Sequence, residues 1–132
     1  MTTRAEGTFD VRLNPQPLTH SYENNLLARL SIDKTLHGDI VGTTTGEMLS
    51  AQTDTKGSAG YVAIEKVSAT LHGRKGTFVL MHVGTLQRGA SSLSVRVVPD
   101  SGTDELVGLH GTFNIIIENG KHFYTFDYGF EE

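Results

Sequence analysis

The chain lacks several features that would place it in a specialised class. It contains no cysteine, so disulfide bonds and thiolate chemistry are excluded and a reducing compartment is compatible with the sequence. No apolar run approaches the roughly 20 residues that a membrane-spanning helix needs, and residues 1–6 lack the apolar stretch of a signal peptide. We therefore expect a soluble, cytoplasmic protein with no membrane partner.

The charge pattern gives no support to nucleic-acid binding. The chain carries 15 acidic and 11 basic residues, for a formal net charge of -4. Because the two signs are interspersed and form no basic stripe, we do not expect a nucleic acid as a partner.

Proline is scarce and glycine is abundant, with 3 and 15 residues respectively. Glycines among β-branched residues are typical of turns, bulges and barrel corners. Eight segments have the composition of strands, and their connections are short. The pattern predicts one all-β domain over residues 1–132, an eight-stranded antiparallel barrel, with a sandwich as the alternative. The predicted strands are Thr8–Leu13, Ala28–Leu36, Ile40–Thr53, Tyr61–Leu71, Thr77–Gln87, Ser92–Val98, Leu109–Glu118 and Lys121–Phe130. A short helix near residues 20–30 and one helical turn within residues 99–105 are minor alternatives.

Turn chemistry sets the register of three predicted hairpins. Asn119-Gly120 favours a type I′ turn that pairs Glu118 with Lys121. We place the other two turns at residues 74–75 and 89–90. On this register Glu65 lies opposite Gly84, and a slip of one residue would invert the faces. The inner face then carries Phe78, Leu80, His82, Gly84, Leu86, Phe113, Ile115, Ile117, His122, Tyr124, Phe126 and Tyr128.

The predicted register brings an acid and an imidazole together inside the barrel. Glu65 and His82 become diagonal neighbours beside a gap at Gly84. Such a pair is suited to general acid-base catalysis, and the alternative is that the two groups only satisfy each other and fix the register. Glu65 and His82 are therefore the candidate catalytic residues. The candidate ligand-binding residues are Tyr61, Gly84, His122, Tyr124, Phe126 and Tyr128.

Neither a metal site nor a cofactor is expected. The six histidines form no HxH or HExxH pattern, and a structural zinc site without cysteine is unusual. A site made by His82, His122 and Glu65 is the one metal-binding alternative that the register leaves open.

Four segments resemble the bacterial DUF3224 family, namely residues 60–65, 71–84, 98–109 and 122–128. Asp104 stands where the family motif usually has glycine, which affects only a loop. The family is similar in fold to allene oxide cyclase, an eight-stranded barrel with an apolar cavity, so the resemblance implies this fold. Its glutamate and histidine motifs fall on Glu65 and His82, but the resemblance assigns them no role.

Two functions follow from these expectations. The first is a barrel that binds a small apolar or amphipathic ligand, with an isomerase- or cyclase-type reaction at the Glu65/His82 pair. The second is a non-enzymatic homo-oligomeric module with a filled core and a structural pair. It rests on apolar side chains expected on the outer face, where they would contact another copy of the chain. These are Val79, Met81, Val83, Ile116 and Phe123.

Overall fold

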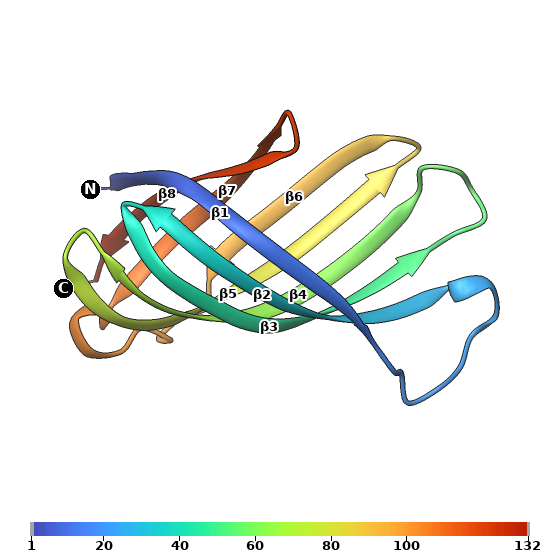
Figure 1. The fold of residues 1–132 in the computed structure, drawn as a ribbon, viewed down its shortest axis with the longest axis horizontal. Helices are drawn as coiled ribbons and strands as arrows, with labels where there is room; N and C mark the ends of the chain where they lie inside the picture. The colour runs from blue at the N-terminus through green and yellow to red at the C-terminus, as the bar shows by residue number, and fades with distance from the viewer. Residues whose placement is uncertain (1, 132) are drawn as a thin grey trace.

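A computed structural model describes residues 2–131 and contains eight antiparallel strands that close into a barrel (Figure 1). Each strand pairs with its neighbours in sequence, and β1 also pairs with β8. The all-β prediction and the barrel are confirmed. The strands are β1 (Thr3–Gln16), β2 (Leu27–Gly38), β3 (Ile40–Gln52), β4 (Ala59–Leu71), β5 (Arg74–Gln87), β6 (Ala90–Val97), β7 (Leu109–Glu118) and β8 (Lys121–Phe130).

Within the part of the chain that the structure describes, helical structure is limited to two single 3-10 turns, η1 (Glu23–Asn25) and η2 (Asp104–Leu106). The helical turn predicted within residues 99–105 corresponds to η2, and the short helix considered near residues 20–30 shrinks to η1. Nowhere in residues 2–131 is there a helix long and apolar enough to cross a membrane.

Strand β1 is longer at both ends than the sequence predicts. Residues 3–9 pair with β8, whereas residues 7–16 pair with β2. The extension arises because one strand must reach two partners that are staggered along the barrel. Such long-range pairing leaves no local signal in the sequence of β1.

Two of the three predicted hairpin registers were wrong. The β4–β5 turn is His72-Gly73 and the β5–β6 turn is Arg88-Gly89, and all four residues have positive φ. Positive φ at both residues is the conformation of a type I′ turn. The sequence placed the first of these turns two residues, and the second one residue, further along the chain. The Asn119-Gly120 turn and its Glu118–Lys121 pair are confirmed.

The register errors leave the inner face unchanged. In the structure Tyr61 lies opposite Gly84 and Glu65 lies opposite Leu80. Each partner is displaced by an even number of residues from the prediction, and side chains alternate with a period of two. Phe78, Leu80 and His82 therefore still point inward.

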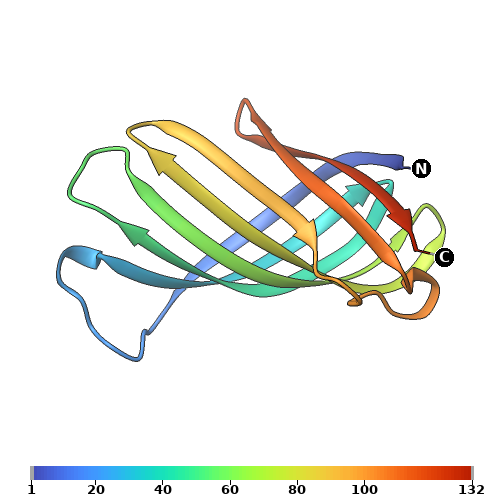
Figure 2. The ribbon, with the colours of Figure 1, turned by 180° about the vertical axis from the view of Figure 1, so that it is seen from behind.

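The two ends of the barrel differ in how completely they are filled. In the closed half, around the β2–β3 and β4–β5 turns, inner-facing side chains such as Leu36 and Phe78 are buried. In the other half, which we call the mouth, inner-facing Leu86 and Leu93 are 42% and 44% exposed. Strands β6 and β7 pair only at Arg96 and Thr112 and diverge toward the mouth (Figure 2).

Candidate functional site

Four polar side chains meet inside the barrel between its two halves. Lys34 on β2, Thr44 on β3, Glu65 on β4 and His82 on β5 are all buried. The Glu65 Oε1 atom accepts hydrogen bonds from Lys34 Nζ at 2.9 Å and from the His82 Nε2 atom at 2.6 Å. Thr44 Oγ1 donates to Glu65 Oε2 at 2.7 Å. We call these four residues the polar cluster.

The polar cluster holds Glu65 as an ionised carboxylate. Burial alone would raise the pKa of Glu65, but the hydrogen bond from His82 and the charge and hydrogen bond of Lys34 lower it to about 2. Because both carboxylate oxygens are occupied by donors, Glu65 is not poised to give a proton to a substrate. The arrangement stabilises a fixed charge in the interior.

Sequence reasoning found half of this cluster. It predicted the contact between Glu65 and His82 but missed Lys34 and Thr44. The available signal was strand alternation, since Lys34 follows Leu30 and Ile32 on the inward face of β2. A glycine also makes room for the cluster, because a Cβ atom at Gly46 would lie 2.6 Å from the Glu65 Cβ atom.

The predicted gap beside Glu65 is filled in the structure. Gly84 lies opposite Tyr61, and the Tyr61 ring covers the glycine. A Cβ atom at Gly84 would lie 2.3 Å from Tyr61 Cε1. The ring centroids of Tyr61 and His82 are 6.3 Å apart, so Tyr61 stands between the mouth and the polar cluster.

The mouth contains a cavity of about 670 Å³. Its lining comes from six strands, β2 to β7, and is mainly apolar. Tyr61 and Gly84 are the deepest lining residues on β4 and β5, and the polar cluster lies beyond them. The apolar side chains that point into this mouth cavity are Leu30, Met48, Leu86, Leu93, Ile115 and Ile117.

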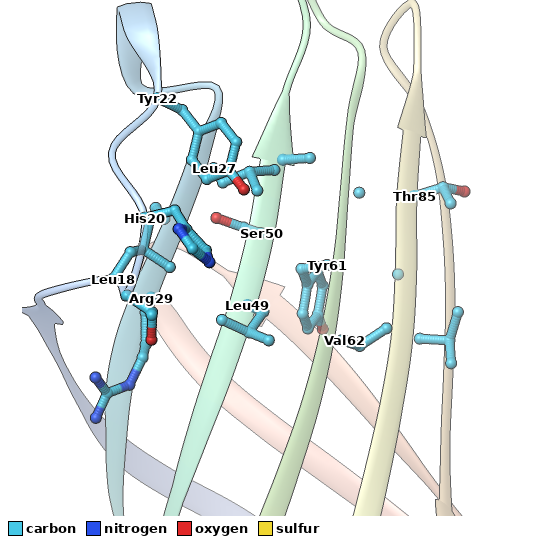
Figure 3. A pocket seen from close by; sticks show the side chains of 16 residues that line it. Leu18, His20, Tyr22, Leu27, Arg29, Leu49, Ser50, Tyr61, Val62 and Thr85 are labelled. Carbon is cyan, nitrogen blue, oxygen red and sulfur yellow. The ribbon is translucent and has the colours of Figure 1, made fainter.

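A second hollow of about 770 Å³ opens on the outer side of β3, β4 and β5 (Figure 3) and shares lining residues with the mouth cavity, Tyr61 and Gly84 among them. The segment that follows β1 overhangs it with Leu18, His20 and Tyr22. Leu49 on β3 and Val62 on β4 form part of its opposite side. We call this hollow the outer groove, and it continues into an apolar surface along β3, β4 and β5.

The structure separates the predicted ligand-binding residues into three groups. Tyr61 and Gly84 line the mouth cavity. Tyr124, Phe126 and Tyr128 lie in the packed aromatic core of the closed half, where Phe126 stacks on Phe78. The Tyr124 hydroxyl donates to the His37 carbonyl oxygen and accepts from the Ile40 amide, which ties β8 to the β2–β3 turn. These three aromatic residues therefore fill the barrel rather than line its cavity.

His122, the remaining predicted residue, packs against Phe9 with a ring-centroid distance of 5.1 Å. Within residues 2–131, the structure brings together no group of three or more His, Cys, Asp or Glu side chains that could hold a metal ion. The arrangement of His82, His122 and Glu65 considered from the sequence is thus not formed.

Comparisons with known proteins place the chain in a family. A search of curated proteins found no match. The solved structures include a DUF3224-family protein of unknown function from Shewanella oneidensis MR-1 that is 48% identical to this chain. The match covers 100% of this chain and 99% of that one, with a TM-score of 0.95. The model of the DUF3224 family, described as a protein of unknown function, matches residues 5–128. The chain belongs to the DUF3224 family.

Proposed function

We propose that the protein binds a small molecule in the mouth cavity. The observation that carries this proposal is the exposure of apolar side chains that point inward, since Leu86, Leu93 and Ile117 lie on the inner face yet remain accessible. A volume of about 670 Å³ falls within the range of ligand pockets, roughly 300–1,000 Å³. A ligand would remove this apolar surface from water.

The polar cluster supports the cavity in this proposal and does not react with the ligand. Glu65 is enclosed by Lys34, Thr44 and His82, and Tyr61 lies between it and the cavity. An isomerase- or cyclase-type reaction at Glu65 would need one of these contacts to open. Ligand binding needs no such change.

A cavity-filling variant tests the proposal. The uncharged fluorescent probe N-phenyl-1-naphthylamine should bind the wild-type protein at one site with increased emission. Leu93→Trp should weaken this binding at least tenfold, because the indole occupies the cavity opposite Gly84. Ile116→Trp is the matched control, since Ile116 is the outward-facing neighbour of Ile115 on β7. Equal binding by Leu93→Trp and wild type, or no binding by wild type, would contradict the proposal.

A second function, self-association, is favoured by the outer surface of β3, β4 and β5. Leu49, Val62, Ile64 and Val83 are each about half exposed there and lie on three adjacent strands. Contiguous apolar surface of this kind commonly marks a contact with a partner. We propose that two copies of the chain meet through this surface, and the mouth cavity is compatible with such a dimer.

Light scattering with a charged variant tests self-association. The wild-type protein should have the mass of a dimer at micromolar concentration, and Val62→Glu should give a monomer. Val41→Glu is the control, because Val41 is also exposed on the outer face of β3 but lies toward the closed half. A monomeric wild-type protein, or dissociation by both substitutions alike, would rule the dimer surface out.

A further inference from the structure

One boundary between neighbouring strands of the barrel is almost unpaired. Strands β6 and β7 share a single residue pair, Arg96 with Thr112, at the end of β6 nearer the closed half. On their other sides, β6 pairs with β5 and β7 pairs with β8 along their whole lengths. The facing edges of β6 and β7 toward the mouth, over residues 90–95 and 113–118, are thus unpaired. We call these two facing edges the open seam.

The open seam leaves hydrogen-bonding groups of the backbone without protein partners. In an antiparallel strand, the N–H and C=O groups of alternate residues point to the neighbouring strand on each side. Among the described residues, no backbone hydrogen bond crosses the seam along residues 90–95 and 113–118. Figure 2 shows the two strands diverging there toward the mouth. Their free N–H and C=O groups are available to another extended chain.

Another free edge of the barrel is protected against pairing, whereas the open seam is not. Residues 10–16 of β1 pair with β2 but lie beyond the part of β1 that pairs with β8, so their second edge is also free. That edge carries Asp10, Arg12 and Pro15, and both charges and proline oppose the addition of a strand. The edges of the open seam contain no proline, and their one charged residue is Glu118, at the end of β7. The open seam therefore lacks the features that keep free edges apart from other strands.

The mouth cavity reaches the open seam from inside the barrel. Ser91 and Leu93 on β6, and Ile115 and Ile117 on β7, lie on the inner face and line this cavity. Residues 90–94 are all exposed, and Ile117 is 64% exposed. Because side chains alternate along a strand, a strand added at the seam would place every second side chain over the apolar cavity and the others in solvent.

We propose that the open seam binds an extended peptide segment of a partner protein, which adds a strand between β6 and β7. The occupant is a peptide because only a chain with its own N–H and C=O groups can pair with a strand edge. A folded second copy of this protein cannot enter between two edges that face each other within one barrel. Since β6 and β7 run in opposite directions, the peptide is antiparallel to one of them and parallel to the other.

The open seam also defines the kind of segment that it would accept. Residues 90–95 and 113–118 correspond to a strand of about 20 Å, or roughly six residues. Its inward side chains should be apolar, since they lie over the mouth cavity, and it should contain no proline. This inference goes beyond the proposed small-molecule function and does not depend on it.

Backbone-modified peptides test strand addition. The probe is a fluorescein-labelled peptide of sequence Lys-Val-Thr-Val-Ser-Val-Thr-Lys, and its binding to the wild-type protein, measured by fluorescence anisotropy, should saturate at one site. N-methylation of the valines removes the N–H groups on one edge of the peptide, and N-methylation of the threonines and serine removes those on the other. Each modification should weaken binding roughly tenfold or more, because several hydrogen bonds are lost while every side chain is kept. Unchanged binding of either modified peptide, or no binding of the parent peptide, would overturn the proposal.

A pair of lysine substitutions tests the location of the peptide. Ile117→Lys places a charge on the β7 edge and should weaken binding of the parent peptide roughly tenfold or more. Leu13→Lys is the matched control, because Leu13 is also about half exposed but lies on the free edge of β1. The control should leave the affinity near that of wild type, and equal weakening by both substitutions would overturn the open seam as the site.

Hydrogen exchange of the wild-type protein gives an independent readout. Bound peptide should slow amide exchange within residues 90–95 and 113–118 and leave residues 10–16 unchanged. Protection outside the open seam alone would contradict the proposal. Binding of N-phenyl-1-naphthylamine is measured in the absence of peptide, so failure of the peptide site and failure of the small-molecule function are distinguished.

Discussion

The closed half and the mouth of this barrel are built from the same strands and the same inward-facing register, yet one is solid and the other is hollow. In the closed half, Phe78, Tyr124 and Phe126 fill the interior. In the mouth, the corresponding inward positions include Gly84, Ser50 and Ser91. The difference shows that side-chain volume, on strands distant in sequence, decides whether an alternating pattern gives a core or a cavity.

The polar cluster lies at the boundary between the two regions. A buried ion pair is weak evidence for stability in itself, because desolvation of both charges offsets their attraction. Once the pair exists, however, loss of either partner leaves a charge in the interior. The cluster therefore holds four adjacent strands in one arrangement directly below the cavity.

The largest predicted effect follows from breaking the polar cluster. Glu65→Gln leaves the Lys34 charge buried without compensation, and we expect a loss of about 3–5 kcal/mol in the free energy of unfolding, measured by urea denaturation. Asp127→Asn is the control, since this carboxylate pairs with Arg4 at the surface, at 2.8 Å. The control should change the free energy of unfolding far less, because solvent screens this exposed pair. Similar losses for the two variants would mean that the cluster does not differ from a surface pair.

Leucine-to-alanine substitutions compare the two halves directly. Leu71 is fully buried in the closed half, and its replacement should cost about 2–5 kcal/mol through lost contacts and a new cavity. Leu93 lines the mouth cavity and is already half exposed, so its replacement should cost less than about 1 kcal/mol. Thermal and urea unfolding of Leu71→Ala and Leu93→Ala give the comparison. Equal losses would indicate that the mouth is packed in solution.

The three hairpin turns differ in how well the sequence predicts them, and the two misplaced turns lie in different halves of the barrel. The β7–β8 hairpin was predictable because Asn119-Gly120 adopts the positive φ angles of its turn at little cost. The turns at His72-Gly73 and Arg88-Gly89 have neither Asn nor Asp before the glycine, so they lack the strong local signal of a type I′ turn, and both turns were misplaced. The inward and outward faces were still predicted correctly, because each register error was an even number of residues and side chains alternate with a period of two.

The candidate site was predictable only in part, for two physical reasons. Lys34 was missed because a lysine is seldom buried, and its carboxylate partner Glu65 is 31 residues away in the sequence. The position of the cavity was not predicted, because an open interior depends on the combined side-chain volumes of residues on six strands. Tyr61 and Gly84 were predicted as ligand-binding residues from the register, and both line the mouth cavity. No local pattern indicated that the aromatic residues of β8 would fill the other half.

A pH titration of stability tests whether the charge of Glu65 in the polar cluster stabilises the fold. The pKa of Glu65 is lowered to about 2 in the folded protein, against an ordinary value of 4.5. Its contribution to stability is therefore present above pH 4.5 and is lost as the pH falls toward 2, with roughly 2 kcal/mol lost by pH 3. The stability difference between wild type and Glu65→Gln should shrink accordingly between pH 6 and pH 3 in urea unfolding. A constant difference would show that the charge of Glu65 is not responsible.

The smallest predicted effect tests whether side chains at the bottom of the mouth cavity are packed as tightly as those of the closed half. A methyl group at Gly84 meets the Tyr61 ring, so Gly84→Ala should displace the ring and cost about 1–2 kcal/mol. Gly60→Ala is the matched control on the adjacent strand, because a Cβ atom there meets only the Gly84 carbonyl oxygen, at 3.8 Å. NMR shifts of the Tyr61 ring and urea unfolding should change for Gly84→Ala and stay near wild type for Gly60→Ala. Should Gly84→Ala be silent in both measurements, the Tyr61 ring would be free to move, and the floor of the cavity would be adaptable where the closed half is rigid.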